Sequence, residues 1–420
     1  MGDSSPGVPG VTTEAAARRW PEALRSLRHR DFRRFWFGLI ISVVGTWMQM
    51  VAQGWLVLKL TDSPLYLGLV GACGSLPMLV FALPAGVAAD RFTKQRLLII
   101  TQSLAMVQAF VLAGLVHFGV VRIWHVMALA ACLGTVNAFD MPTRHAMVLD
   151  LAAREDVLNA VALNSSAFNS GRIVGPAVAG LLVARAGMAG CFFINGLTFF
   201  ATIIALLTIR PRPPRAVLDG DLVRHIKDGL AWVRDNRHAT WLLALTAVSS
   251  IFAMPYTTLM PIFARDVLGV GPQGFGFLMS ASGLGALTSA LALTAFGSKW
   301  RLGLLTSIGS FSFPLALLLV SMAPVYALAA ACIYFTGVGM MLFNAVSNTI
   351  LQKTPPDALR GRVMSLRTFF FAGLGPVGNL QIGVTGEWLG ARGAIALGAA
   401  ACLAMAALAW WRAPEVRRTA

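Results

Sequence analysis

Long apolar runs separated by short polar links make up most of this chain. A hydropathy window of about nineteen residues identifies twelve such runs, at 35–58, 65–88, 97–118, 123–143, 159–184, 187–209, 239–263, 273–297, 302–322, 324–350, 363–386 and 391–411. A helix of roughly 20 apolar residues crosses a hydrocarbon layer about 30 Å thick. The pattern therefore predicts an all-α integral membrane protein with twelve transmembrane helices.

Two short landmarks recur in the second half of the chain. The Asn-Ala pair at Asn137 recurs at Asn344, and the Gly-Pro pair at Gly175 recurs at Gly375. Their offsets are 207 and 200 residues, and each pair falls in the same helix of its half. Together with the six-plus-six helix count, they predict two pseudo-symmetric six-helix bundles. The interface of such bundles holds a substrate site that opens alternately to each side.

The links and tails divide the chain further. We expect a disordered N-terminal tail (1–28), a first bundle (29–209), a linker (210–238), a second bundle (239–411) and a C-terminal tail (412–420). Within the linker, Leu222, Ile226, Leu230 and Val233 share one helical face, and Arg224, Lys227, Asp228, Arg234 and Asp235 take the other. This predicts an amphipathic helix in the headgroup layer. A plain connector and a partner-binding helix both remain open.

Composition supports the membrane class. Of 420 residues 57% are hydrophobic and 12% charged, and mean hydropathy is +0.70, whereas about a quarter of a soluble domain is charged. The net charge of +16 would suggest nucleic acid in a soluble chain, but the basic residues fall in the short links. Twenty-seven of the 34 Lys and Arg lie in one set of links and five in the other. This asymmetry predicts cytoplasmic termini and no nucleic-acid partner.

Cysteine and histidine usage gives no sign of a cofactor, a metal or a reaction centre. The five cysteines lie inside apolar runs without CxxC spacing, which is typical of small packing residues. The six histidines are scattered, whereas a polytopic enzyme would gather catalytic groups at one membrane face. We therefore expect no enzyme activity, and a membrane scaffold is a remote alternative.

The link between the second and third helices carries a charged motif, Gly86-Val-Ala-Ala-Asp90-Arg91-Phe-Thr-Lys94-Gln-Arg96. A small residue permits close helix approach, a carboxylate ends the helix, and a cationic turn follows. The motif resembles the hallmark loop of the major facilitator superfamily, with Thr93 in place of the family's glycine. The resemblance implies a gate latch. Asp90 would face the N-terminal dipole of the eleventh helix and Lys94 would bridge to Asp140. Simple positive-inside charges are the alternative.

The fifth helix carries a glycine ladder around a proline, at Gly171, Gly175, Pro176 and Gly180. Such a face lets helix backbones touch, and proline bends the helix. The ladder resembles the fifth-helix motif of the antiporter branch of the superfamily, which implies export. Gly375 and Pro376 would form the matching bend of the second half. A pure packing role is the alternative.

Three further segments narrow the resemblance: 137–144, 154–164 and 357–365. They are similar to the bacterial transmembrane secretion effectors, which include enterobactin exporters and macrolide-efflux-type permeases. The resemblance spans residues 24–411. It implies a monomeric secondary transporter of the bacterial inner membrane that exports a small organic molecule, such as a siderophore, polyketide or drug. An importer or facilitator on the same fold stays open, because no carboxylate is predicted at the membrane midplane.

A few polar residues within apolar helices are candidates for coupling and cargo binding. Asp140 is the deepest carboxylate and hence the proton-coupling candidate, although a latch role explains it equally well. Arg172 and Arg367 must face water or a partner. Arg172 is placed either to attract an anionic or carbonyl-rich cargo or to form a hydrogen bond with Asn164 or Asn169. The full set of cavity candidates is Gln49, Gln53, Asn137, Asn164, Arg172, Asn344, Asn348 and Arg367.

Overall fold

The computed structural model describes residues 21–210, 222–297 and 300–413, and their regular structure is entirely helical. The first half comprises η1 (Glu22–Arg28), α1 (Arg30–Thr61), α2 (Pro64–Arg91), α3 (Lys94–His117), α4 (Ile123–Leu151), η2 (Arg154–Asp156) and α5 (Val157–Leu207). Helix α6 (Leu222–Asp235) precedes the second half. That half comprises α7 (Arg237–Val248), η3 (Ser249–Ala253), α8 (Tyr256–Ile262), η4 (Phe263–Val267), α9 (Pro272–Phe296), α10 (Leu302–Met322), α11 (Tyr326–Lys353), α12 (Asp357–Thr368), η6 (Phe369–Gly373) and α13 (Gly375–Arg412).

Two helical stretches, Arg154–Leu207 and Asp357–Arg412, are long enough to cross a membrane twice. Ten helical segments of the described chain have the length and hydropathy of a membrane span. In α5 and α13 the chain doubles back at Gly187 (φ 70°) and Gly390 (φ 69°), a left-handed conformation that glycine adopts without a Cβ clash. Counting both arms of each gives the twelve predicted crossings, so the chain is a multi-pass membrane protein. Both turns follow the fifth crossing of their half, as a duplication predicts.

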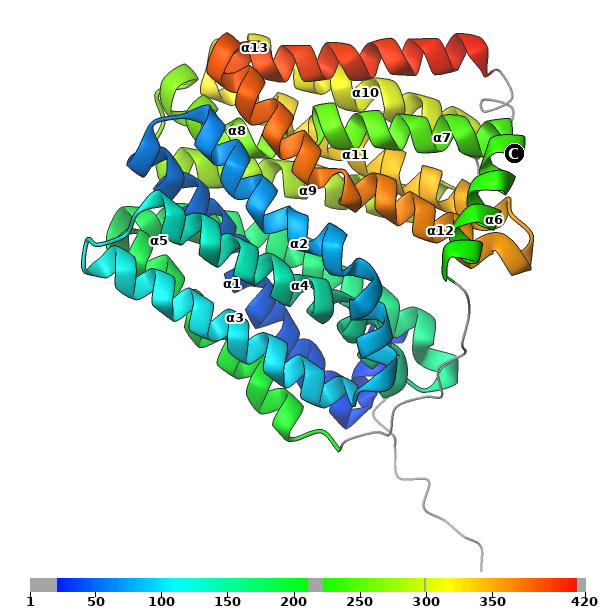
Figure 1. The fold of residues 1–420 in the computed structure, drawn as a ribbon, viewed down its shortest axis with the longest axis horizontal. Coiled ribbons are helices and arrows are strands. Elements are labelled where there is room, and N and C mark those ends of the chain that lie inside the picture. The colour runs from blue at the N-terminus through cyan, green and yellow to red at the C-terminus, as the bar shows by residue number, and fades with distance from the viewer. Residues whose placement is uncertain (1–20, 211–221, 298–299, 414–420) are drawn as a thin grey trace, which may run out of the picture.

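The two halves meet along pairs of helices. In Figure 1, α1 to α5 form one bundle and α7 to α13 the other, with α2 beside α13 and α5 beside α9. Glycines bring these pairs into backbone contact. A Cβ added at Gly276 of α9 would lie 2.3 Å from the Pro176 carbonyl oxygen of α5, and one at Gly68 of α2 would lie 2.7 Å from Gly383 Cα of α13. Such close approaches stabilise helix pairs in lipid by van der Waals packing.

The buried core is shared at one end of the molecule and divided at the other. The largest cluster joins both halves at the end away from the termini, and includes Met48, Phe192, Tyr256 and Phe275. At the end that carries the termini, each half has a cluster of its own, one around Phe35 and one built from 233–413. The halves therefore form one packed unit at the first end and two at the second.

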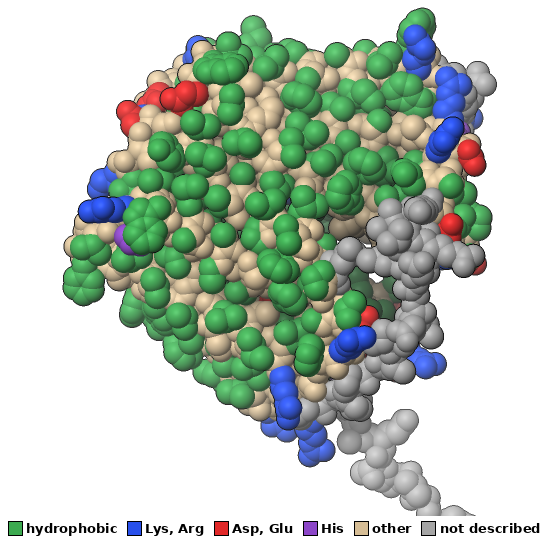
Figure 2. Space-filling model, viewed as in Figure 1, with side chains coloured by type: hydrophobic (Ala, Val, Ile, Leu, Met, Phe, Trp, Pro, Cys, Tyr) green, Lys and Arg blue, Asp and Glu red, His purple; other side chains and the backbone are tan. Residues whose placement is uncertain are grey.

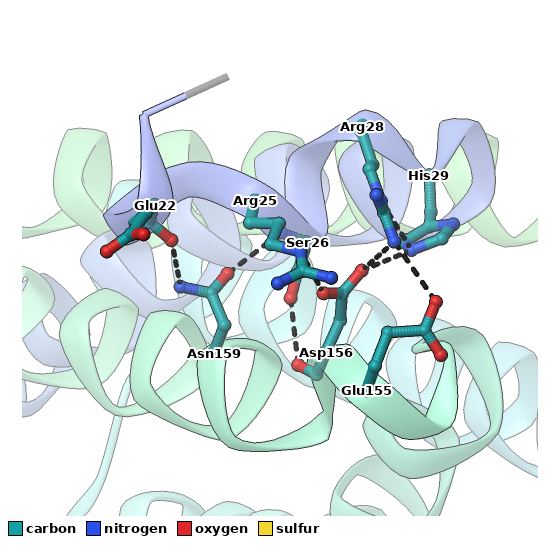
Figure 3. A network of polar contacts seen from close by, with 8 residues as sticks. All are labelled: Glu22, Arg25, Ser26, Arg28, His29, Glu155, Asp156 and Asn159. Carbon is teal, nitrogen blue, oxygen red and sulfur yellow. Dashed lines mark hydrogen bonds and ion pairs between the residues drawn. The ribbon is translucent and has the colours of Figure 1, made fainter. Parts of the chain in front are cut away.

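The N-terminal segment differs from expectation. Residues 22–28, which we assigned to a disordered tail, form η1, and this 3-10 helix packs on the start of α5 (Figure 3). The buried carboxylate of Asp156 pairs with the side chains of Arg25 at 2.8 Å, Arg28 at 2.9 Å and His29 at 2.7 Å. The Ser26 amide donates to the Asn159 side chain at 2.8 Å. Basic residues thus hold η1 in place by charge-assisted hydrogen bonds. Residues 1–20 and 414–420 of the expected tails lie outside the described part.

Helix α6 lies against the second half. Asp228 forms an ion pair with Arg362 of α12 at 2.5 Å, and Gly229 packs on the same arginine. Val233 is buried in the cluster that contains Val363, while Leu230 is exposed. The first part of the linker, 211–221, lies outside the described residues. The helix is therefore docked on α12 through its C-terminal half.

We predict that Asp156→Asn lowers the free energy of unfolding by about 2 kcal/mol, because it removes a buried anion that receives hydrogen bonds from charged groups. The measurement is chemical unfolding of the purified protein in mixed micelles. Glu155→Gln is the matched control. Its side chain is 59% exposed, so its effect should stay within about 0.5 kcal/mol. Equal effects of the two substitutions would contradict the anchoring role of Asp156.

Candidate functional site

Polar contacts join the two halves at the end away from the termini. Arg265, just before α9, forms an ion pair with Asp62, which follows α1. Glu387 of α13 accepts hydrogen bonds from the Ser63 hydroxyl at 2.8 Å and from the Leu65 amide at 3.2 Å. A carboxylate at the first turn of α2 also interacts favourably with the helix dipole. These contacts and the shared core close this end, which we call the closed end.

The halves separate at the end that carries the termini, which we call the open end. Figure 2 shows the surface hollowed between the halves there. Nothing lies within 4 Å of a Cβ built on Gly86 of α2 or on Gly361 of α12. On α5, Ser165 and Ser166 are exposed although they belong to an apolar helix. The site between the halves is thus accessible from one side only.

The predicted latch residues lie at this open end. Asp90, Arg91 and Arg96 are exposed, and no hydrogen bond or ion pair joins Asp90 to another described residue. Lys94, in contrast, is buried and pairs with Asp150 at 2.5 Å. Our prediction that Lys94 bridges to Asp140 was wrong. Helix α4 continues to Leu151, beyond the predicted end at 143, so Asp150 and not Asp140 reaches the start of α3.

Asp140 lies well inside α4, and only 1% of its surface is exposed. Its carboxylate accepts hydrogen bonds from Thr101 at 2.9 Å and Gln102 at 2.7 Å, and forms an ion pair with Arg144 one turn further on. Gln102 in turn accepts from Ser42 of α1 at 3.2 Å. The predicted helix end at 143 would leave this carboxylate in the last turn, whereas the structure buries Asp140 inside α4. It is a buried acid with a cationic neighbour, tied to α1, α3 and α4.

Two of the predicted cavity residues are buried within the first half. Gln49 donates to Gln108 at 3.0 Å and accepts from Asn195 at 2.6 Å, which links α1, α3 and α5. Asn164 of α5 is 3% exposed. Gln49 is therefore engaged within the first half, whereas Asn164, whose side-chain oxygen has no hydrogen-bond partner among the described residues, stays a candidate. Hydrogen bonds between helices account for Gln49, because a polar group buried in lipid needs a partner within the protein.

Three other candidates remain compatible with a cavity. Gln53, Asn137 and Asn348 are partly exposed. Within the described ranges, none of them has a hydrogen-bond partner. Their amides are free to bind water or a ligand.

Arg172 reaches from the first half into the second. Its guanidinium donates to the Ser282 hydroxyl of α9 at 3.2 Å and lies 3.9 Å from the Met340 sulfur of α11. Ser282 also bonds with the buried Tyr256 hydroxyl at 2.9 Å. The bond to Asn164 or Asn169, which we considered, is not formed. Arg172 instead lies where Gly283 of α9 packs on the backbone of α5, one turn before Pro176.

Arg367 approaches the same helix from the second half. It donates to the Asn344 backbone carbonyl of α11 at 3.2 Å and lies over the Phe371 ring at 5.5 Å. Its Nε atom and the Asn344 side-chain oxygen are both buried without a hydrogen-bond partner among the described residues. Unsatisfied polar atoms of this kind are rare in folded proteins, so this location has unused binding capacity.

The glycine ladder has a packing role in the structure. Gly171 and Gly175 lie against Trp47 of α1, and Gly180 lies against Gln273 at the start of α9. Pro176 lies inside the continuous helix α5. The matching Gly375 and Pro376 begin α13 directly after a π-helical turn. The repeated Gly-Pro pair therefore marks a helix break in the second half only.

Sequence reasoning missed three groups of this site: Asp150, Glu387 and the partners of Arg172. A signal for Glu387 was present in the sequence. It stands four residues after Gly383, as Asp90 stands four residues after Gly86, and Gly383 packs on α2. The partners Ser282 and Met340 carried no comparable signal, because serine and methionine are common in membrane helices.

Comparisons with known proteins agree with this architecture. A family profile described as transmembrane secretion effector matches residues 22–418. The staphyloferrin A transporter of Staphylococcus aureus is 24% identical over 85% of this chain and 89% of its own. The multidrug efflux pump Tap of Mycolicibacterium fortuitum is 27% identical over 83% and 87%. The nucleoside transporter NupG shares the fold, with a TM-score of 0.69, 13% identity, and coverage of 93% of this chain and 98% of its own.

We predict that Lys94 is energetically coupled to Asp150 and not to Asp140. In a double-mutant cycle with Lys94→Met and Asp150→Asn, each single change strands a buried charge, and the double change removes both. The coupling should reach about 1–3 kcal/mol. It is measured from chemical unfolding in mixed micelles. The parallel cycle of Lys94→Met with Asp140→Asn should give less than about 0.5 kcal/mol, and a larger coupling there than with Asp150 would contradict the observed pairing.

Proposed function

We propose that the protein exports a small organic molecule by secondary active transport, because the chain belongs to the transmembrane secretion effector family of the major facilitator superfamily. The family consists of membrane transporters, so a polytopic enzyme is excluded. The names of two relatives, a staphyloferrin A transporter and a multidrug efflux pump, support a siderophore-like or drug-like cargo.

The proposed orientation places both termini in the cytoplasm of a bacterial cell, with the protein in the inner membrane. The charge asymmetry of the links supports it, because Lys-rich and Arg-rich links resist translocation. The open end then faces the cytoplasm, where an exporter collects its cargo, and the closed end faces outward.

Alternating access is the proposed mechanism, and the division of the buried core into shared and separate clusters supports it. The halves share one buried cluster at the closed end and have separate clusters at the open end. The halves are thus able to rock about the site between them. The side chains of Asp62 and Arg265 are 73% and 37% exposed, and an exposed ion pair contributes only about 0–1 kcal/mol. In the outward-open state these contacts break, and Asp90 closes the cytoplasmic end against the start of α12.

Protons are the proposed coupling ion, with Asp140 as the titrating group. Its place inside α4, its burial and its contact with Arg144 support this role. A latch role for Asp140 would need a contact with Lys94, but Lys94 pairs with Asp150. Protonation of Asp140 would release Arg144 and loosen the contacts to α1 and α3.

Inverted membrane vesicles test export and coupling together. The vesicle interior is made more acidic than the medium. Vesicles that contain the protein should then accumulate a fluorescent dye, either carboxyfluorescein or rhodamine 6G, severalfold over vesicles without the protein. Asp140→Asn should abolish the response to the pH gradient. Glu155→Gln is the control, since this side chain is 59% exposed and pairs only at the surface with Arg28.

Two outcomes would contradict this proposal. Dye uptake by right-side-out vesicles without uptake by inverted ones would identify an importer. Equilibration of dye in both directions, with no effect of the gradient, would identify a facilitator.

We predict that Asp90→Asn reduces transport about tenfold while membrane insertion and thermal stability stay unchanged. Asp90 is exposed in the cytoplasm-open state, so its loss does not weaken that state. It removes the charge that stabilises the opposite state at a helix N-terminus, an interaction of about 0.3–2 kcal/mol. Transport per inserted molecule is measured in vesicles, again with Glu155→Gln as the control. Normal transport by a fully inserted Asp90→Asn protein would remove the latch from the mechanism.

A further inference from the structure

Two arginines from opposite halves lie against one stretch of α11. Arg172 of α5 contacts the Met340 sulfur at 3.9 Å, and Arg367 of α12 donates to the Asn344 carbonyl at 3.2 Å. Met340 and Asn344 are four residues apart, so the two contacts lie about one helical turn, roughly 6 Å, from each other along α11. The structure therefore brings two positive charges together between the halves.

Neither arginine has an acidic partner within 21–210, 222–297 and 300–413. The groups around Arg172 are a hydroxyl, a thioether and the Tyr256 phenol. Those around Arg367 are a backbone carbonyl and an aromatic ring. Burying a cation without a counter-ion costs several kcal/mol. The described part of the protein therefore neutralises neither cation, and an anionic ligand would supply the missing negative charge.

The location suits a ligand that enters from the open end. A Cβ at Gly283 of α9 would lie 2.9 Å from the Arg172 carbonyl oxygen, so the halves touch at this level. Ser165 and Ser166, about two turns nearer the open end of α5, are exposed. Arg367 lies on α12, which begins at the open end. Arg172 thus lies where the two halves touch, and Arg367 lies on the second half against the same helix, α11.

We infer that Arg172 and Arg367 form an anion-binding site, and that the cargo is an organic anion with two or more carboxylate groups. This inference rests on the proposed function. Guanidinium groups bind carboxylates through paired hydrogen bonds of matched geometry, and two carboxylates neutralise the two cations. Among the described residues the buried Nε of Arg367 and the buried side-chain oxygen of Asn344 have no partner, so the first is left to donate to a carboxylate and the second to accept from a hydroxyl or amide of the same ligand.

Binding of a matched pair of dyes to the purified full-length protein tests the inference. Carboxyfluorescein and rhodamine 6G share a xanthene core, but the first is an anion with carboxylates and the second a cation with an esterified one. Fluorescence anisotropy with protein in nanodiscs should give tighter binding of carboxyfluorescein. Arg172→Gln and Arg367→Gln should each weaken it about tenfold or more, and the double variant further.

A matched control removes the same charge elsewhere. Arg392 also donates to a backbone carbonyl, that of Ala323 at 3.2 Å, but it lies at the closed end, and Arg392→Gln should leave carboxyfluorescein binding within about twofold. Arg172→Lys and Arg367→Lys keep the charge and lose the paired geometry, so they should bind with intermediate affinity. They also test the site if a glutamine variant does not fold.

The outcomes separate this inference from the proposed function. Unchanged carboxyfluorescein binding in the folded variants, equal losses in Arg392→Gln, or preferential binding of rhodamine 6G by the wild type would overturn the anion site. Wild-type protein that binds carboxyfluorescein through both arginines but does not move it into inverted vesicles would overturn export and leave the anion site standing.

Discussion

The packing of the two halves at the closed end is the constraint on which the rest of the structure depends. In lipid no hydrophobic force drives one apolar helix onto another, so the halves are held by close backbone approach and by polar contacts. Gly68, Gly276 and Gly383 provide this approach, and a shared buried cluster surrounds it. Because the joint lies at one end, the other end is free to part. The accessible site, the exposed Asp90 and the position of the two arginines all follow from this arrangement.

The polar groups of the membrane interior fall into two kinds. Some are satisfied within one half, as in the contact of Gln49 with Gln108 and Asn195, or of Asp140 with Arg144. These groups fix the helices of one bundle, and a rigid bundle is what a rocking motion requires. Arg172 and Arg367 are of the second kind, because their charges have no acidic partner in the described chain. Within a bilayer, this difference distinguishes polar groups that hold helices together from polar groups that bind a ligand.

The sequence predicted the class, the number of crossings and the duplication well, because each rests on a strong and repeated signal. Helix ends were predicted poorly, since a hydropathy window stops where charge begins. The last two turns of α4 carry Arg144 and Asp150 and were read as a link, and the wrong partner was then assigned to Lys94. The direction in which a polar side chain points could not be predicted from the sequence either. Gln49 and Gln53 share a helical face, yet the first is buried in a hydrogen-bonded network and the second is partly exposed.

Placing one cation on each half has a consequence for the motion itself. A ligand shifts a conformational equilibrium only by the difference between its affinities for the two states. A ligand held by residues of one half alone would contact the same groups in both states and would shift little. An anion held by Arg172 from the first half and Arg367 from the second senses the relative position of the halves. A few kcal/mol of differential affinity is enough to move such an equilibrium substantially, and the closed end is held in part by exposed contacts of low energy. Cargo binding and rocking are therefore able to act on each other through this pair of charges.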